Sequence, residues 1–118
     1  MSTNFTPLDL QSHQLPTSIL TYLRASKAPK TIEVFIEDPQ VTDNGTRYAS
    51  RKEVLHFLTS VTTEYAYTTT FQRAAQAEPD QYAVWNRLEG SFPGSTADLK
   101  YTFNLHNGLI RSLEITAA

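Results

Sequence analysis

Apolar and polar residues alternate most regularly in the last third of the chain. Over residues 99–105 every second side chain is apolar, which is typical of a β-strand with one buried face. Asn107-Gly108 follows shortly after, and both residues tolerate the positive φ angles of a type I′ hairpin turn. We therefore predict three antiparallel strands over 81–92, 99–105 and 109–115, with a longer turn over 93–98.

Helical spacing replaces this alternation in the first part of the chain. Pro16 is a favourable first-turn residue, and the apolar stripe that follows it predicts a first helix. A short second helix is predicted from Pro29, because the apolar residues over 32–36 have i, i+3, i+4 spacing. Pro39 ends this helix, since the residue before a proline is disfavoured in the α conformation.

A hairpin and a third helix are predicted next. Asn44-Gly45 is a second type I′ signal, which indicates two short strands over 40–43 and 46–49. Ser50 followed by Glu53 matches a capping box, in which each residue satisfies a backbone N–H at the start of a helix. The third helix is therefore predicted to begin after Ser50.

The order of elements then indicates the fold class. Residues 63–72 are rich in Tyr, Thr and Phe and predict a strand, whereas 73–80 fits a helix or, better, a ragged strand that ends in a hairpin turn. Helices on one face of an antiparallel sheet form an α+β fold, and a strongly curved sheet leaves a cavity at its open end. We expect one such domain over 15–118, preceded by a flexible arm over 1–14.

Composition and charge exclude several classes of partner. The net charge of −2 gives no basic surface for nucleic acid, and the absence of cysteine excludes disulfides and thiolate zinc sites. There is neither a signal-peptide pattern nor an apolar run long enough for a membrane, so we expect a cytoplasmic protein. The histidines are scattered, so no metal and no cofactor is expected; His56 is predicted on the outer face of its helix, with the inner face as the alternative.

Three stretches of the chain resemble the nuclear transport factor 2-like family, which includes SnoaL-like polyketide cyclases and ketosteroid isomerases. They are residues 35–48 together with the helix around 54–58, residues 88–95 and residues 99–113, and the resemblance extends over roughly 15–115. It implies a cone-shaped, curved antiparallel sheet wrapped around about three N-terminal helices. It also implies a homodimer formed through the sheet.

The resemblance to ketosteroid isomerases implies one catalytic position. Their general base, an aspartate in the first hairpin, corresponds to Asp43. Their oxyanion-binding tyrosine corresponds to Ile19, with Tyr22 one turn away, and their protonated aspartic acid corresponds to about Leu99. Neither Ile19 nor Leu99 can donate a hydrogen bond from its side chain, so the resemblance transfers only the base.

Asp43 has two interpretations from the residues alone. A carboxylate that faces an apolar cavity has a raised pKa, which suits a general acid or base near neutral pH. Alternatively, the side chain supports the Asn44-Gly45 turn through a local hydrogen bond, as aspartate often does. Both interpretations stay open at this point.

The aromatic residues are candidates for the wall of a pocket, with their core or dimer-face roles as the alternative. Tyr22 and Tyr48 are the preferred polar groups, because each comes from an element expected near the open end of the cone. Arg87 and Glu89 share a strand face with Trp85 and fit either a pocket or a solvated or dimer-facing surface. The complete set of ligand-binding candidates is Tyr22, Tyr48, Phe57, Trp85, Tyr101 and Phe103.

The expected function is therefore a pocket that binds an apolar or aromatic small molecule. One alternative is an isomerase, cyclase or dehydratase with Asp43 as general acid or base and Tyr22 or Tyr48 polarising a carbonyl. Another is a non-catalytic dimeric interaction module, including the case in which side chains fill the interior.

Overall fold

The computed structural model describes residues 8–11, 14–25, 29–60, 67–90 and 96–118, and the structural statements below concern these residues. None of the described helices is long and apolar enough to cross a membrane. The elements in chain order are β1 (Leu8–Leu10), α1 (Thr17–Ala25), the 3-10 helix η2 (Pro29–Val34), β2 (Phe35–Asp43), β3 (Thr46–Tyr48), α2 (Arg51–Ser60), β4 (Tyr67–Glu78), β5 (Gln81–Gly90), β6 (Thr96–His106) and β7 (Leu109–Ala117).

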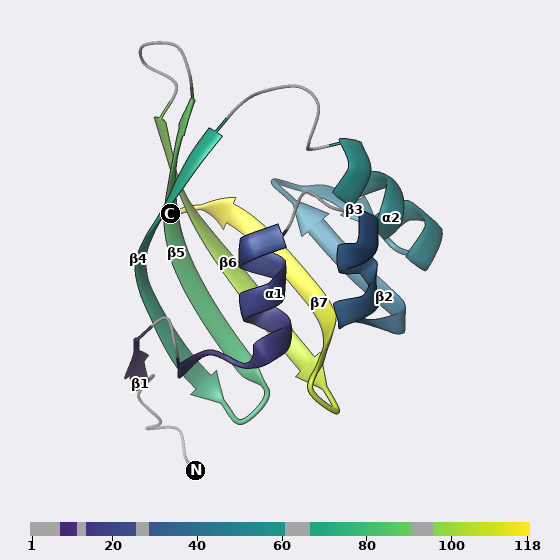
Figure 1. The fold of residues 1–118 in the computed structure, drawn as a ribbon, viewed down its shortest axis with the longest axis horizontal. Helices are drawn as coiled ribbons and strands as arrows, with labels where there is room; N and C mark the ends of the chain where they lie inside the picture. The colour runs from purple at the N-terminus through teal and green to yellow at the C-terminus, as the bar shows by residue number, and fades with distance from the viewer. Residues whose placement is uncertain (1–7, 12–13, 26–28, 61–66, 91–95) are drawn as a thin grey trace.

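The described strands form one curved sheet in the order β1-β4-β5-β6-β7-β2-β3. The long strands β4 to β7 curve around α1, while α2 lies beside the short β2–β3 hairpin (Figure 1). All neighbouring strands are antiparallel except β2 and β7, which are parallel. The α+β class is confirmed, but the sheet is mixed and not purely antiparallel as predicted.

The prediction of about three helices is also corrected, because the described residues contain two α-helices and one 3-10 helix. The predicted second helix is η2, and it ends at Val34. The chain continues as β2 from Phe35, within the predicted helix, because one short triplet of apolar residues fits a single helical turn followed by a strand equally well. Pro39 lies within β2 between Phe35 and Gln40, where the register shifts, and a strand tolerates a proline at such an irregularity.

The preferred interpretation of 73–80 is confirmed, because β4 continues to Glu78 with register shifts that make it irregular and a turn follows it; residues 63–66 lie outside the described part. One strand boundary and one strand pairing differ from the sequence prediction. β6 begins at Thr96, so part of the predicted turn over 93–98 is strand. Within the predicted N-terminal arm, β1 pairs with β4, and no local sequence pattern predicted this contact.

Both predicted type I′ turns are confirmed by their backbone angles. Asn44 and Gly45 have φ angles of 50° and 91°, and Asn107 and Gly108 have φ angles of 53° and 81°. Positive φ at both central residues is the geometry that these turns require. The two turns fix the register of β2 on β3 and of β6 on β7.

The hydrophobic core lies between the helices and the concave face of the sheet. Arg51 holds α2 in place, since its guanidinium donates hydrogen bonds to the carbonyl oxygens of Ile36 at 2.9 Å and Ile32 at 3.4 Å. The largest fully buried side chains are Phe35, Phe103, Ile19, Leu58, Ile110, Leu113, Val41, Val54, Val84 and Pro39.

The capping box before α2 gives a first testable prediction. The Glu53 N–H donates to Ser50 Oγ at 3.1 Å, and the Ala49 N–H donates to Glu53 Oε1 at 2.8 Å. We expect Ser50→Ala to lower the free energy of unfolding by about 1 kcal/mol in urea titrations, because it removes the first of these bonds. Ser50→Asp keeps a capping oxygen and serves as the control; equal stability of the two variants would contradict the assignment.

Candidate functional site

Asp43 and Tyr101 lie in one row of residues across the concave face of the sheet. The strand register pairs Asp43 with Ile115, Ile115 with Tyr101, and Tyr101 with Val84. Residues directly opposite one another on paired strands project from the same face. The row therefore runs from β2 through β7 and β6 to β5, with Asp43 at one end and the Tyr101 phenol in the middle.

Tyr22 projects from α1 onto the same face. Its ring centroid lies 6.5 Å from that of Tyr101, 5.7 Å from that of Phe103 and 6.1 Å from that of Phe35, all with edge-to-face geometry. Phe103 is fully buried and stacks on Tyr101 with a centroid distance of 6.4 Å. Phe103 therefore belongs to the core and packs against both tyrosine rings.

The electrostatics of the two phenols follow from this placement. Burial raises the pKa of Tyr22 far above its usual range, and the nearby Tyr101 and Asp43 raise it further. Burial and the charge of Asp43 raise the pKa of Tyr101 to about 12. Both hydroxyl groups therefore stay protonated at physiological pH and are able to donate a hydrogen bond.

The Asp43 carboxyl is partly exposed, and burial raises its pKa above the ordinary value. The hydrogen bond next to it is a backbone one, donated by the Asn44 N–H to the carbonyl oxygen of Ile115 at 2.9 Å. Within the described residues, the carboxylate itself makes no hydrogen bond, either to its own turn or to another element. This leaves its oxygens available to a bound molecule.

Asn86 is a site residue that the sequence reasoning missed. It lies two residues after Val84 on β5, so it projects from the concave face, and it is only 3% exposed. Its Oδ1 has no hydrogen-bond partner within the described part of the chain. The available signal was a polar residue in the alternating set Tyr82, Val84, Asn86 and Leu88.

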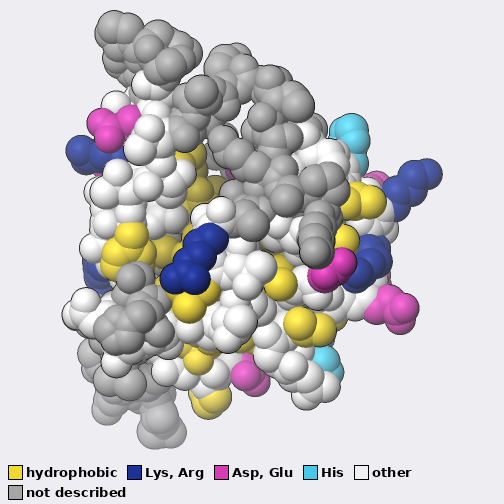
Figure 2. All heavy atoms as spheres, in the orientation of Figure 1, with side chains coloured by type: hydrophobic (Ala, Val, Ile, Leu, Met, Phe, Trp, Pro, Cys, Tyr) yellow, Lys and Arg dark blue, Asp and Glu magenta, His cyan; other side chains and the backbone are white. Residues whose placement is uncertain are grey.

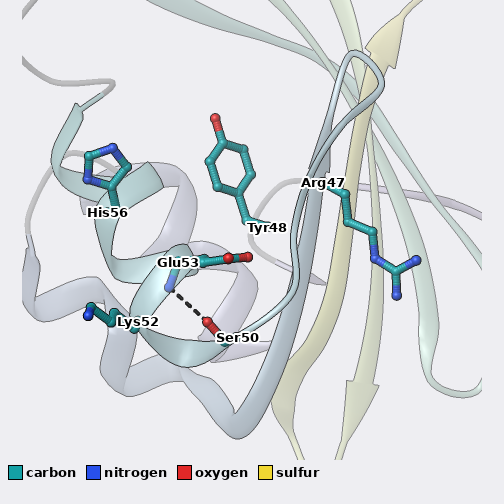
Figure 3. A pocket seen from close by; sticks show the side chains of 6 residues that line it. All are labelled: Arg47, Tyr48, Ser50, Lys52, Glu53 and His56. Atoms are coloured by element: carbon teal, nitrogen blue, oxygen red, sulfur yellow. Dashed lines mark hydrogen bonds between the residues drawn. The ribbon is translucent and has the colours of Figure 1, made fainter.

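Tyr48 and Phe57 lie together at a second place, between β3 and α2. Their ring centroids are 5.0 Å apart. Tyr48 also lines an open hollow of about 520 Å³, with its hydroxyl pointing away from the Ser50–Glu53 cap (Figure 3). His56 is exposed on α2 beside it, so the outward orientation predicted for this histidine is confirmed.

Trp85 lies on the outer face of the sheet, and the structure does not bring it together with Tyr22, Tyr101 and Phe103. Its neighbours Val84 and Asn86 project inward, so its own side chain projects outward. There the Arg73 guanidinium lies 4.2 Å and the Lys100 ammonium 5.4 Å from the centroid of its ring system.

Arg87 lies on the same outer face, where its guanidinium pairs with the Asp98 carboxylate at 2.8 Å and both side chains are well exposed. The dimer through this face stays a prediction.

The charged groups of the described residues form no candidate metal centre. No group of three or more His, Asp or Glu side chains among them is arranged to hold a metal ion. Lys and Arg side chains lie scattered over the face seen in Figure 2. The candidate site consists of the polar side chains on or against the concave face of the sheet, namely Asp43, Tyr22, Tyr101 and Asn86. We call this set the concave-face cluster.

Comparison with known proteins identifies the fold. No family model matches the chain, and no curated protein matches it significantly. Among solved structures, a proposed polyketide cyclase from Sinorhizobium meliloti is 27% identical, with a TM-score of 0.79 over 91% of this chain and 100% of that chain. A protein with a ketosteroid isomerase-like fold from Catenulispora acidiphila, solved in complex with trimethylamine, is 12% identical. Its TM-score is 0.75 over 89% of this chain and 88% of that chain.

An NTF2-like protein of unknown function from Cytophaga hutchinsonii has a TM-score of 0.68 at 12% identity and covers 100% of this chain and 95% of its own. The chain has the nuclear transport factor 2-like fold. The predicted resemblance is thereby confirmed. The two matches at 12% identity concern the fold alone, because one fold of this kind supports many unrelated activities.

Ile19 and Leu99, which the resemblance places where ketosteroid isomerases have their oxyanion donors, each have a polar residue nearby. Ile19 is fully buried, but Tyr22, one helical turn later, belongs to the concave-face cluster and contacts Tyr101. Leu99 is paired across the strands with Asn86. The cluster therefore combines a carboxyl group of raised pKa, two protonated phenols and one amide.

Proposed function

We propose that the concave-face cluster binds an apolar or aromatic carbonyl compound and moves a proton at the carbon next to its carbonyl group. The observation that carries this proposal is the Asp43 carboxylate, partly buried, free of hydrogen bonds within the described residues and close to two phenols. Phe103 and Phe35 pack against Tyr22, so this phenol lies in apolar surroundings that suit a ligand with an apolar ring system.

In the proposed reaction the Asp43 carboxylate removes the proton. The electrons of the C–H bond form a C=C bond, and the carbonyl oxygen becomes an enolate oxygen that accepts a hydrogen bond from Tyr22 or Tyr101. Return of the proton to a different carbon completes an isomerisation. A raised carboxyl pKa favours this step, because a base is most effective when its pKa approaches the working pH.

The test uses the two-ring ketone 2-tetralone, whose acidic protons exchange with deuterium in D₂O. We expect the protein to accelerate this exchange above the rate in buffer, as measured by the loss of the ¹H NMR signal. The rate rises with pH through the raised pKa of Asp43, because the ionised carboxylate is the active form. Binding of the ketone without faster exchange would contradict catalysis and favour the non-catalytic binding module.

A further inference from the structure

Asn86 is a buried polar residue whose side-chain oxygen is not satisfied within the described part of the chain. It is 3% exposed, and its Oδ1 lacks a hydrogen-bond partner among the described residues. A buried carbonyl oxygen without a hydrogen-bond partner destabilises a protein. In native structures almost all buried polar groups therefore have a partner. A ligand that donates a hydrogen bond would satisfy this one.

The strand register places the amide at the far side of Tyr101 from Asp43. Asn86 pairs with Leu99, two residues from the Val84–Tyr101 pair, so its side chain is diagonal to the Tyr101 phenol. Asp43 lies two strands away from Tyr101 in the other direction, on β2. Three strand spacings, about 14 Å along the sheet, therefore separate the backbones at Asn86 and Asp43. Both side chains belong to the concave face, so a ligand that contacts both of them carries its two polar groups at opposite ends of a ring system.

We propose that Asn86 recognises a hydroxyl or N–H group at the end of the ligand opposite its carbonyl. This inference rests on the proposed function, because the carbonyl is taken to lie beside Asp43 and the phenols. Oδ1 is a hydrogen-bond acceptor, so its partner on the ligand has to be a donor, and an ether or a second ketone does not qualify. The substrate class becomes hydroxylated or amino-substituted two-ring ketones, and Asn86 is a specificity-determining residue that leaves the proton transfer to Asp43.

Three ligands of nearly equal shape test this role. They are 6-hydroxy-2-tetralone, 6-methoxy-2-tetralone and unsubstituted 2-tetralone, of which only the first carries a hydroxyl donor. In calorimetric titrations we expect the wild-type protein to bind the hydroxy compound about tenfold more tightly than either of the others. The Asn86→Leu variant, which has a side chain of similar size without polar atoms, binds all three with similar affinity.

Asn104→Leu is the matched control. Asn104 lies on the neighbouring strand β6 but on the outer face, and its side chain is hydrogen-bonded to Gln81 at 3.3 Å and Ser112 at 3.1 Å. This variant should lower the urea midpoint of unfolding and keep the tenfold preference. Asn86→Leu should show the opposite pattern, with an unchanged or higher midpoint and no preference.

The outcomes separate this inference from the proposed function. Equal affinity of the wild-type protein for the hydroxy and methoxy ketones would overturn the role of Asn86, even if deuterium exchange continues, and this result does not depend on any variant folding. A preference that survives in Asn86→Leu would overturn it as well. If none of the three ketones binds the wild-type protein, the proposed function fails and this inference fails with it.

Discussion

We expect Asp43→Asn to reduce the catalysed deuterium exchange of 2-tetralone by about 10²- to 10⁴-fold, the usual contribution of a positioned general base. An amide has nearly the shape of a carboxyl group but cannot accept the proton. Ketone affinity should change far less than turnover, because the apolar surroundings and the Tyr22 and Tyr101 donors remain. Exchange rates measured at saturating ketone separate the two effects.

The same substitution should also raise stability at neutral pH. Burial places the pKa of Asp43 in the folded protein above its value in the unfolded chain. Between these two pKa values the folded state binds more protons than the unfolded chain, so the free energy of unfolding falls as pH rises through this window. Asp43→Asn lacks this loss. Its advantage in urea titrations should be largest at neutral pH and disappear below the ordinary aspartate pKa of about 3.9.

Asp38→Asn provides the matched control for both effects. Asp38 lies on the same strand, β2, with an exposed side chain. Its amide variant should keep the exchange rate and show no comparable gain in stability at neutral pH. If Asp43→Asn retained full exchange activity, the assignment of the base would be wrong; if it lost stability instead, the carboxylate would have a structural role that its contacts do not reveal.

The sequence predicted those parts of the fold that depend on neighbours along the chain. Alternation over 99–105 predicted the strand that carries Tyr101 and Phe103, and Asn-Gly pairs predicted both tight turns. The capping box of Ser50 and Glu53 predicted the start of α2. In each case the decisive interaction spans only a few residues, so the local pattern contains it.

The unpredicted parts depend on contacts between distant segments. The parallel pairing of β2 with β7 joins Phe35–Asp43 to the end of the chain, and no local pattern specifies it. Alternation along β5 separates Trp85 from Val84 and Asn86 but does not say which set faces the helices. For this reason Trp85 was grouped with the pocket residues while Asn86 was overlooked. Asp43 was identified through the family resemblance, and Tyr22 could be connected to it only through the packing of α1 on the sheet.

The second large effect concerns Phe103, for which we expect the alanine substitution to lower the free energy of unfolding by about 3–5 kcal/mol. The ring is fully buried, packs edge-to-face on Tyr22 and stacks on Tyr101. Removing it leaves a cavity under both phenols, because the long strands β5, β6 and β7 cannot close around one side chain. Domains of this size have a total stability of about 5–15 kcal/mol, so the substitution removes about a fifth of it or more.

Leu109→Ala is the control for Phe103→Ala, since Leu109 is a large apolar residue at the start of β7 that is 38% exposed. It should cost less than about 1 kcal/mol in the same urea titrations, because little apolar area leaves a buried environment. The two variants also address whether the interior is tightly packed. A cost for Phe103→Ala no greater than that for Leu109→Ala would mean that the ring sits loosely and that Tyr22 and Tyr101 are not held in the positions on which the proposed chemistry depends.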